Sequence, residues 1–147
     1  MLSNTCKYAI RSLIYLANFA DSGTKLGLKK ITEDLNIPSP FLGKILQSLA
    51  RENVLCSTKG PHGGFALGKK PEEISLYDII VLVDGESYFS NCIIRLEPCS
   101  CFAEEISTCP IHKRFNGMRD ELISFYKETT LADIIDDYSI SGEVIRF

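Results

Sequence analysis

Apolar residues recur at helical spacing near the start of the chain, and turn-forming residues divide them into separate stretches. The first stretch follows Ser3, whose hydroxyl can cap a helix, and it ends at the polar residues 21–23. The second stretch, residues 28–35, is short and amphipathic, and residues 36–38 interrupt it. The pattern therefore predicts one longer helix followed by one short helix.

A third apolar stretch, from Phe41 to Leu49, follows after only a few residues. Ser39 and Pro40 precede it and predict an N-cap followed by proline at the first helical position. Two helices joined by such a short turn are typical of a helix-turn-helix. A plain helical hairpin within a bundle has the same periodicity, so the next segment has to distinguish the two.

That segment has the pattern of two short strands around a turn-rich loop. Residues 54–56 and 65–67 are short and mostly apolar. The loop between them contains Lys59, Gly60, Pro61, His62, Gly63 and Gly64. Three helices followed by a hairpin form a winged helix, which favours the helix-turn-helix over the bundle hairpin.

The middle of the chain predicts a fourth helix and then a long loop. Ser75 and Asp78 form a capping box, and the helix runs to Val83 and closes at residues 84–85. The following loop, roughly residues 88–112, is longer than most connections within a compact domain. Because loops of this length are usually functional or disordered, we expect a functional role for it.

A long helix is expected over residues 113–128, with one apolar seam. The seam residues are Phe115, Met118, Leu122 and Phe125. An unpartnered seam predicts a homodimer paired through this helix, and the alternative is a stripe that packs back on its own domain. A last short turn is expected from Thr130 to Ile135, with a loosely held tail from Ser139.

The net charge of −3 hides a division between the two halves of the chain. Residues 1–70 hold ten basic and four acidic side chains, a net +6, and the remaining residues hold six and fifteen, a net −9. A basic first half favours a polyanion such as double-stranded DNA as its partner. No apolar run approaches the roughly 20 residues that span a bilayer, so we expect a soluble, cytoplasmic protein with no membrane partner.

Together these patterns predict a mainly α fold with a small β-hairpin wing. We expect a winged helix-turn-helix DNA-binding domain in residues 1–84 and a cysteine-rich functional loop in residues 85–112. Residues 113–147 are expected to hold the dimerisation helix and a C-terminal tail.

Six cysteines are present, and four of them cluster in the long loop. The clustered residues are Cys92, Cys99, Cys101 and Cys109. In a reducing compartment, clustered thiols favour metal binding over a disulfide framework. Cys6 and Cys56 stand alone, and we expect both to pack as small buried hydrophobes.

Residues 7–82 resemble the IscR, NsrR and CymR type of winged-helix transcriptional repressors. The resemblance is carried by residues 8–10, 39–46 and 72–76, and above all by the wing sequence of residues 57–65. It implies DNA binding as a homodimer. The residues that would contact DNA are Lys29, Ser39, Pro40, Phe41, Lys44, Ser57, Lys59, Gly60, Pro61, His62, Gly63 and Gly64.

The resemblance also implies how DNA would be contacted. The start of the recognition helix, residues 39–44, would enter the major groove, and Lys59 and His62 would approach the adjacent minor groove or its phosphates. Several relatives carry a glutamate where this chain has Gly43, and a glutamate can accept from the cytosine amino group. This departure affects the operator sequence rather than DNA binding itself.

The same resemblance implies a metal centre. Many sensor members carry three cysteines, often with a histidine shortly after the last. The implied ligands are Cys92, Cys99, Cys109 and His112, with Cys101 as an alternative to Cys99 because the interval from Cys99 to Cys109 is longer than usual. Thiolates with one imidazole suit an iron–sulfur cluster, such as one of the 2Fe–2S type, or zinc, and the resemblance favours the cluster. A thiol–disulfide switch at residue 99 or 101, or a loop without any centre, are the alternatives.

The function expected from the sequence is DNA-binding transcriptional regulation, as a repressor gated by the cluster or by thiol redox state. A metal-free winged-helix regulator, or a dimeric interaction module without a bound centre, is the alternative. The chain has no glycine-rich phosphate loop, no paired carboxylate motif and no oxyanion element, so neither an enzyme nor a small-molecule substrate is expected. A nucleophile and base at Cys109 and His112 is the weaker enzymatic interpretation.

Overall fold

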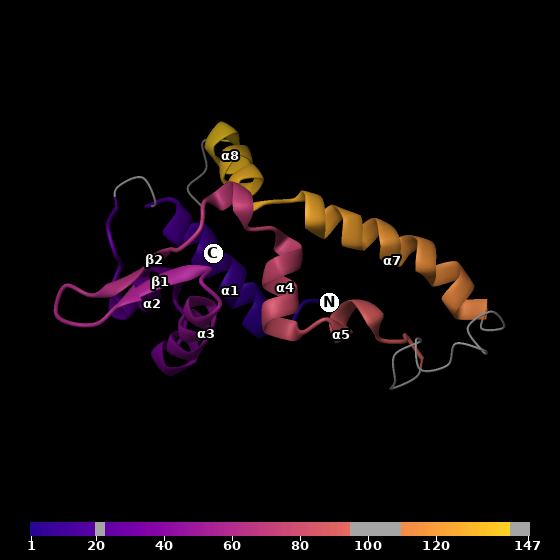
Figure 1. The fold of residues 1–147 in the computed structure, drawn as a ribbon, viewed down its shortest axis with the longest axis horizontal. Helices are drawn as coiled ribbons and strands as arrows, with labels where there is room; N and C mark the ends of the chain where they lie inside the picture. The colour runs from indigo at the N-terminus through magenta and orange to yellow at the C-terminus, as the bar shows by residue number, and fades with distance from the viewer. Residues whose placement is uncertain (20–22, 95–109, 142–147) are drawn as a thin grey trace.

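The computed structural model describes residues 1–19, 23–94 and 110–141. The chain folds into a helical body with one two-stranded hairpin, and a long helix extends away from it (Figure 1). In chain order the elements are α1 Asn4–Ala17, α2 Leu28–Leu35, α3 Ser39–Arg51, β1 Leu55–Thr58, β2 Gly64–Leu67, the 3-10 helix η2 Pro71–Glu73, α4 Leu76–Asp84, α5 Ser87–Ser90, α7 Pro110–Glu128 and α8 Leu131–Ser141. The predicted mainly α fold with a β-hairpin wing is confirmed.

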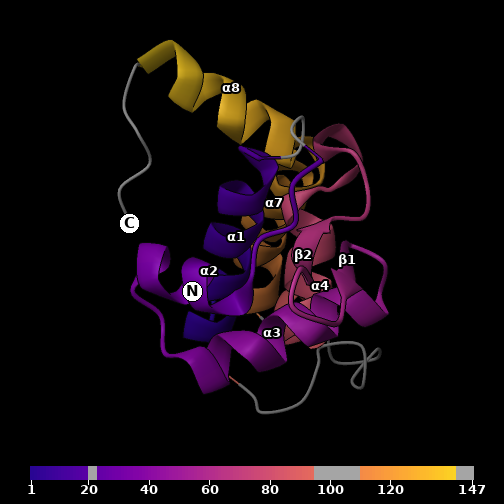
Figure 2. The same cartoon turned by 90° about the vertical axis from the view of Figure 1, so that its left-hand side faces the viewer.

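Helix α1 is the centre of the body, with α2, α3, α4 and the hairpin around it (Figure 2). The Ser3 hydroxyl accepts a hydrogen bond from the backbone N–H of Cys6 at 3.0 Å, as the sequence predicted. Leu13 and Leu16 are fully or almost fully buried in the core. The helix ends at Ala17, earlier than expected, because the chain turns at Asn18.

Helices α2 and α3 form the helix-turn-helix. Asn36 closes α2 in the left-handed conformation, with φ of 52°. Helix α3 starts one residue earlier than the sequence suggested, since the Pro38 carbonyl accepts from the N–H groups of Phe41 and Leu42 at 3.1 and 3.0 Å. Ser39 is therefore the first helical residue rather than the N-cap, and Pro40 is the second.

The two strands pair antiparallel, with Leu55 opposite Leu67 and Thr58 opposite Gly64. A contact that periodicity did not predict extends the hairpin: Leu26 and Phe65 exchange two backbone hydrogen bonds of 2.9 Å each. The approach is close at Gly64, where an added Cβ would lie 2.5 Å from the Leu26 carbonyl oxygen. This pairing fixes the hairpin to the segment that precedes α2.

The C-terminal part returns to the body through α8. Ser75 and Asp78 form the predicted capping box of α4. The segments on either side of Thr130 pair with this region, since Leu76 N–H donates to the Thr129 carbonyl and Leu131 N–H donates to the Ile74 carbonyl, both at 2.9 Å. Leu131 is completely buried.

Helix α8 continues to Ser141, so the predicted end of the last turn at Ile135 is wrong, and residues 139–141 of the predicted tail are helical. The rest of that tail, residues 142–147, lies outside the described residues. The chain has no glycine or proline between Thr130 and Gly142 to end the helix earlier. Apolar residues of its first turns pack on the core, and this contact adds to the local helix preference.

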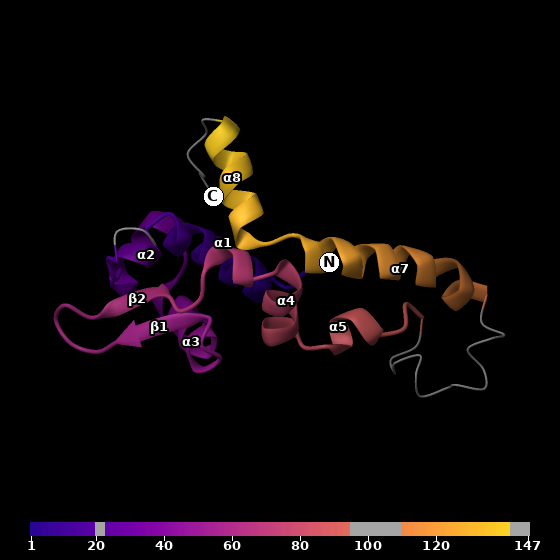
Figure 3. The same ribbon diagram turned by 45° about the horizontal axis from the view of Figure 1, so that its top comes forward.

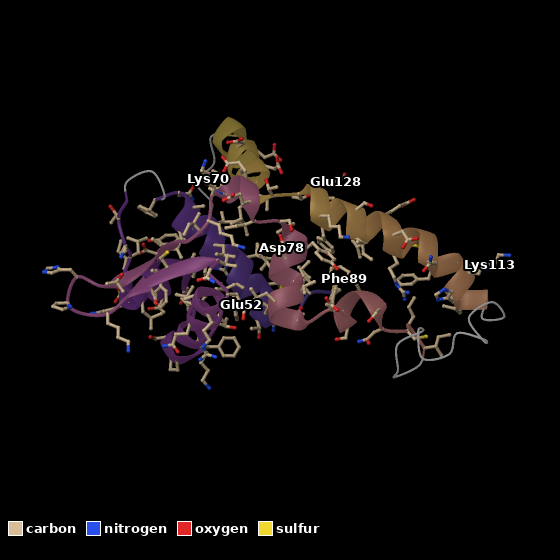
Figure 4. The ribbon with its side chains drawn as sticks, viewed as in Figure 1. Glu52, Lys70, Asp78, Phe89, Lys113 and Glu128 are labelled. Atoms are coloured by element: carbon tan, nitrogen blue, oxygen red, sulfur yellow. The ribbon has the colours of Figure 1, made fainter. Side chains whose placement is uncertain are left out.

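Helix α7 extends away from the winged-helix body, and Lys113 and Glu128 mark its two ends (Figures 3 and 4). It begins at Pro110, before the predicted start, as proline is well tolerated in a first helical turn. Tyr126 near its C-terminal end packs on Phe89 of α5 with ring centroids 5.9 Å apart. Phe89 in turn stacks on Tyr77 of α4 at 4.8 Å, so aromatic side chains join α4, α5 and α7.

The two isolated cysteines differ. Cys6 is fully buried, and burial together with the nearby Asp84 carboxylate raises the pKa of its thiol to about 12. Cys56 is exposed, so the expectation that it packs inside is wrong. Side chains alternate along a strand, and the inward position of β1 is taken by its neighbour Leu55. Across the described ranges, no helix has both the length and the apolar character needed to cross a membrane.

Candidate DNA interface and cysteine segment

The start of α3 presents an exposed surface. Ser39, Pro40 and Lys44 are exposed, and Phe41 is 45% exposed although its ring meets that of Tyr8 edge-on at 5.8 Å. Tyr8 on α1 therefore supports Phe41 from beneath. Gly43 is buried, and a Cβ there would lie 3.3 Å from the Leu28 side chain. Position 43 thus supplies no polar group to this surface.

The loop of the hairpin projects from the end of the molecule opposite to α7 (Figures 1 and 3). The predicted wing residues Ser57, Lys59, Gly60, Pro61 and His62 are all exposed, and residues 63–64 are half-buried. Gly60 has φ of 113°, which favours glycine, and its carbonyl accepts from Gly63 N–H at 2.9 Å. The loop is therefore a hydrogen-bonded turn, and the exposed side chains of Lys59 and His62 extend from it into solvent.

A hollow of about 450 Å³ lies between the second half of α3 and the hairpin. Its lining residues are Gln47, Ala50, Arg51, Ser57, Thr58, Lys59 and Phe65. Ser57 and Lys59 were predicted from the sequence, but Gln47 and Arg51 were missed. The helical spacing of Lys44, Gln47 and Arg51, which places all three on one face of α3, could have identified them.

Lys29 is exposed at the first turn of α2 and lies 4.0 Å from Glu33, in a pair whose side chains are 90% and 64% exposed. Such a solvated pair contributes little to folding, which leaves the lysine available to a phosphate. Lys25 lies beside the hairpin, and its ammonium group donates to the Thr58 hydroxyl at the base of the wing.

Gly63→Ala is expected to weaken DNA binding at least about tenfold. This is the loss of affinity expected when one or two hydrogen bonds to a charged group are broken. The added Cβ would lie 2.1 Å from the Thr58 carbonyl oxygen, so the wing backbone has to move. The measurement is a fluorescence-anisotropy titration of a labelled operator duplex. Gly27→Ala is the matched control, because a Cβ there meets nothing within 4 Å; equal affinities for the two variants would contradict the expected role of the wing.

Two of the predicted metal ligands lie among the described residues. Cys92 is half-buried just after α5, and its sulfur accepts from the Ile94 N–H at 3.5 Å. His112 is in the first turn of α7 and is half-buried, and its Nδ1 is shielded from solvent without a hydrogen-bond partner among the described residues. Cys99, Cys101 and Cys109 lie outside the described ranges. Within those ranges, no three histidine, cysteine or acidic side chains are grouped as a metal site.

The predicted seam of α7 is mostly open to solvent. Met118, Leu122 and Phe125 are 65%, 39% and 54% exposed, and Phe115 is half-buried. Ile111, which the sequence reasoning missed, is 37% exposed and extends the same alternating three- and four-residue spacing. The neighbouring face of α7, which includes Ile123 and Tyr126, packs on the body of the chain.

A basic recognition helix beside a projecting hairpin defines a winged-helix transcriptional regulator. The profile of the Rrf2 family, described as an iron-dependent transcriptional regulator, matches residues 2–137, and the chain belongs to this family. The chain is 35% identical over 136 residues to an HTH-type transcriptional regulator of Aquifex aeolicus, and the aligned region covers 92% of each chain.

Two solved structures have the same fold. The global cysteine regulator CymR of B. subtilis has a TM-score of 0.74 and 23% identity, with 93% of this chain and 97% of that chain covered. T. potens IscR has a TM-score of 0.71 and 18% identity, with 99% of this chain and 93% of that chain covered. The relatives are transcriptional regulators rather than enzymes.

Proposed function

We propose that the protein is a cytoplasmic, homodimeric repressor that binds double-stranded DNA through α3 and the wing. The supporting observation is one exposed surface that combines the start of α3, the adjoining hollow and the hairpin loop. Lys44, Arg51 and Lys59 on this surface form no ion pair with any described residue. An α-helix fits into the major groove of double-stranded DNA. Unpaired cations beside that helix can bind the phosphates that flank the groove.

The test is the salt dependence of binding to a duplex selected from a random-sequence library. The logarithm of the affinity should fall linearly with the logarithm of the salt concentration. Lys44→Gln and Lys59→Gln should each reduce the slope by about 0.9, the value for one lost phosphate contact. Lys113→Gln removes the same charge at the far end of α7 and should leave the slope unchanged (Figure 4). A slope near zero in the unmodified protein would refute DNA binding.

The proposal includes a metal centre held by residues of the 85–112 segment, between the DNA-binding residues 1–84 and the dimerisation residues 113–147. The donor chemistry fits: Cys92 offers a sulfur that already accepts a backbone N–H, and His112 offers a shielded nitrogen that has no partner in the described part of the chain. Cys99 and Cys109 complete the proposed set, with Cys101 as the alternative to Cys99. The family description as iron-dependent favours an iron–sulfur cluster over zinc.

When bound, such a cluster would supply redox sensitivity at a position with a replaceable histidine ligand. For the cluster to control DNA binding, residues of the chain have to connect the cluster site to the DNA-binding surface. His112 is in the helix that also carries the exposed seam, and α5 is joined by aromatic contacts to α4. A change near residues 92 and 112 can therefore reach the dimer helix and the winged-helix body through direct contacts.

A further inference from the structure

One face of α7 carries three side chains at intervals of seven residues, which is two helical turns: His112, Arg119 and Tyr126. All three are half-buried, whereas most of the helix surface is exposed. Seven residues correspond to about 10 Å along the helix axis. The three side chains therefore lie at successive levels of one helix face, from His112 near the N-terminal end of α7 to Tyr126 near its C-terminal end.

The segment that contains α5 runs along this face in the opposite direction (Figures 1 and 3). Phe89 contacts Tyr126 at the level nearest the body. Two residues later, the Asn91 carbonyl oxygen accepts a hydrogen bond of 3.0 Å from the Arg119 guanidinium. The next residue, Cys92, thus continues toward the end of α7 that carries His112.

Arg119 is itself held in place. Its guanidinium lies over the Phe115 ring at 5.2 Å, so the aromatic ring orients the planar group while one of its nitrogens donates to Asn91. An arginine stacked on a ring loses less conformational freedom when it makes such a bond than a free side chain would. The contact between α7 and the residue before Cys92 is therefore preorganised.

The geometry points to Arg119 as a positioning residue for the metal ligands. By fixing Asn91, it holds the residue before Cys92 against the helix face that also carries His112. This role rests on the metal centre proposed above, but the docking of the segment on α7 does not. The two can therefore be tested separately.

The first test needs no metal. Hydrogen–deuterium exchange is measured on the reduced, metal-free full chain, in the peptide that spans residues 87–94. Arg119→Ala should raise its exchange rate about tenfold, since a hydrogen bond from a charged donor opposes local opening by roughly that factor. Arg114→Ala, which changes an exposed arginine of the same helix, should leave it unchanged. Equal exchange in both variants would overturn the proposed docking.

The second test uses the iron–sulfur protein as purified without air. With a chelator present, the visible absorption of Arg119→Ala should decay about tenfold faster than that of the unmodified protein, as expected for loss of a group that orients a ligand. Arg119→Lys, which keeps the charge but not the stacked planar donor, should restore part of the lifetime. Identical decay in all three would overturn the role toward the centre. If the unmodified protein holds no cluster, the proposed centre fails while the exchange result still decides the docking.

Discussion

Cys92→Ala is expected to abolish iron and sulfide binding by protein purified anaerobically, whereas Cys101→Ala is expected to retain both. A cluster needs a thiolate at each cysteine position, and alanine offers no donor. Among the described residues, Cys92 is the cysteine of the proposed ligand set, and it is half-buried and already accepts a backbone N–H. The measurement is iron and sulfide analysis per chain, together with ultraviolet–visible absorption.

Cys56→Ala is the control for the general effect of losing a thiol, because this cysteine is exposed on β1 in the wing hairpin. It should leave the metal content unchanged. Loss of the cluster in Cys101→Ala but not in a Cys99→Ala variant would replace Cys99 by Cys101 in the ligand set. Zinc without sulfide would replace the cluster by a tetrahedral site. A colourless, metal-free unmodified protein would refute the centre and leave a regulator whose cysteines act as thiols or not at all.

The same preparations test whether the centre controls DNA binding. If ordering of the segment resets the two recognition helices, loaded and metal-free protein should differ in operator affinity by several-fold or more. The two helices have to match a DNA repeat of roughly 34 Å, so a small change in the dimer changes the fit. Equal affinities for the same operator would show that the centre, even when present, does not gate binding.

The periodicity of the sequence predicted the winged helix because, in this part of the chain, the local preferences of capping and turn residues agree with the pattern of buried apolar residues. The capping box at Ser75 and the turn at Gly60 each use residues whose local conformation decides the element. The exchange of hydrogen bonds between Leu26 and Phe65 was not predictable, since it joins residues far apart in sequence through backbone groups that any residue carries.

The candidate sites show the same limit. Lys59 was identified because the wing has a recognisable composition. The spacing of Arg51 from Lys44 shows only that the two share a face of α3, and the packing of the hairpin shows that this face borders the wing. Cys56 was misassigned because composition does not tell which side of a strand a residue faces. Arg119 had no sequence signal at all, as its partner is the carbonyl of Asn91.

The double substitution Met118→Glu with Phe125→Glu is expected to weaken self-association at least about a hundredfold, since each buried apolar side chain contributes roughly 1.5–3 kcal/mol and the dimer loses two from each protomer. Both residues are exposed in the single chain, at 65% and 54%, on the seam of α7. A homodimer through this helix would cover them, and two carboxylates facing an apolar seam would be desolvated without partners. The measurement is sedimentation equilibrium over a wide range of protein concentration.

The matched control is Gly117→Glu with Ser124→Glu, which adds the same charge one residue before each seam position. Both control positions are exposed, and a side chain at Gly117 meets nothing within 4 Å. The control should remain dimeric, and both double variants should stay folded with a cooperative thermal unfolding transition, because none of the four residues belongs to the core. Dimerisation that survives the seam substitutions would place the interface elsewhere, and the exposed face of α7 would then need another partner to explain its apolar side chains.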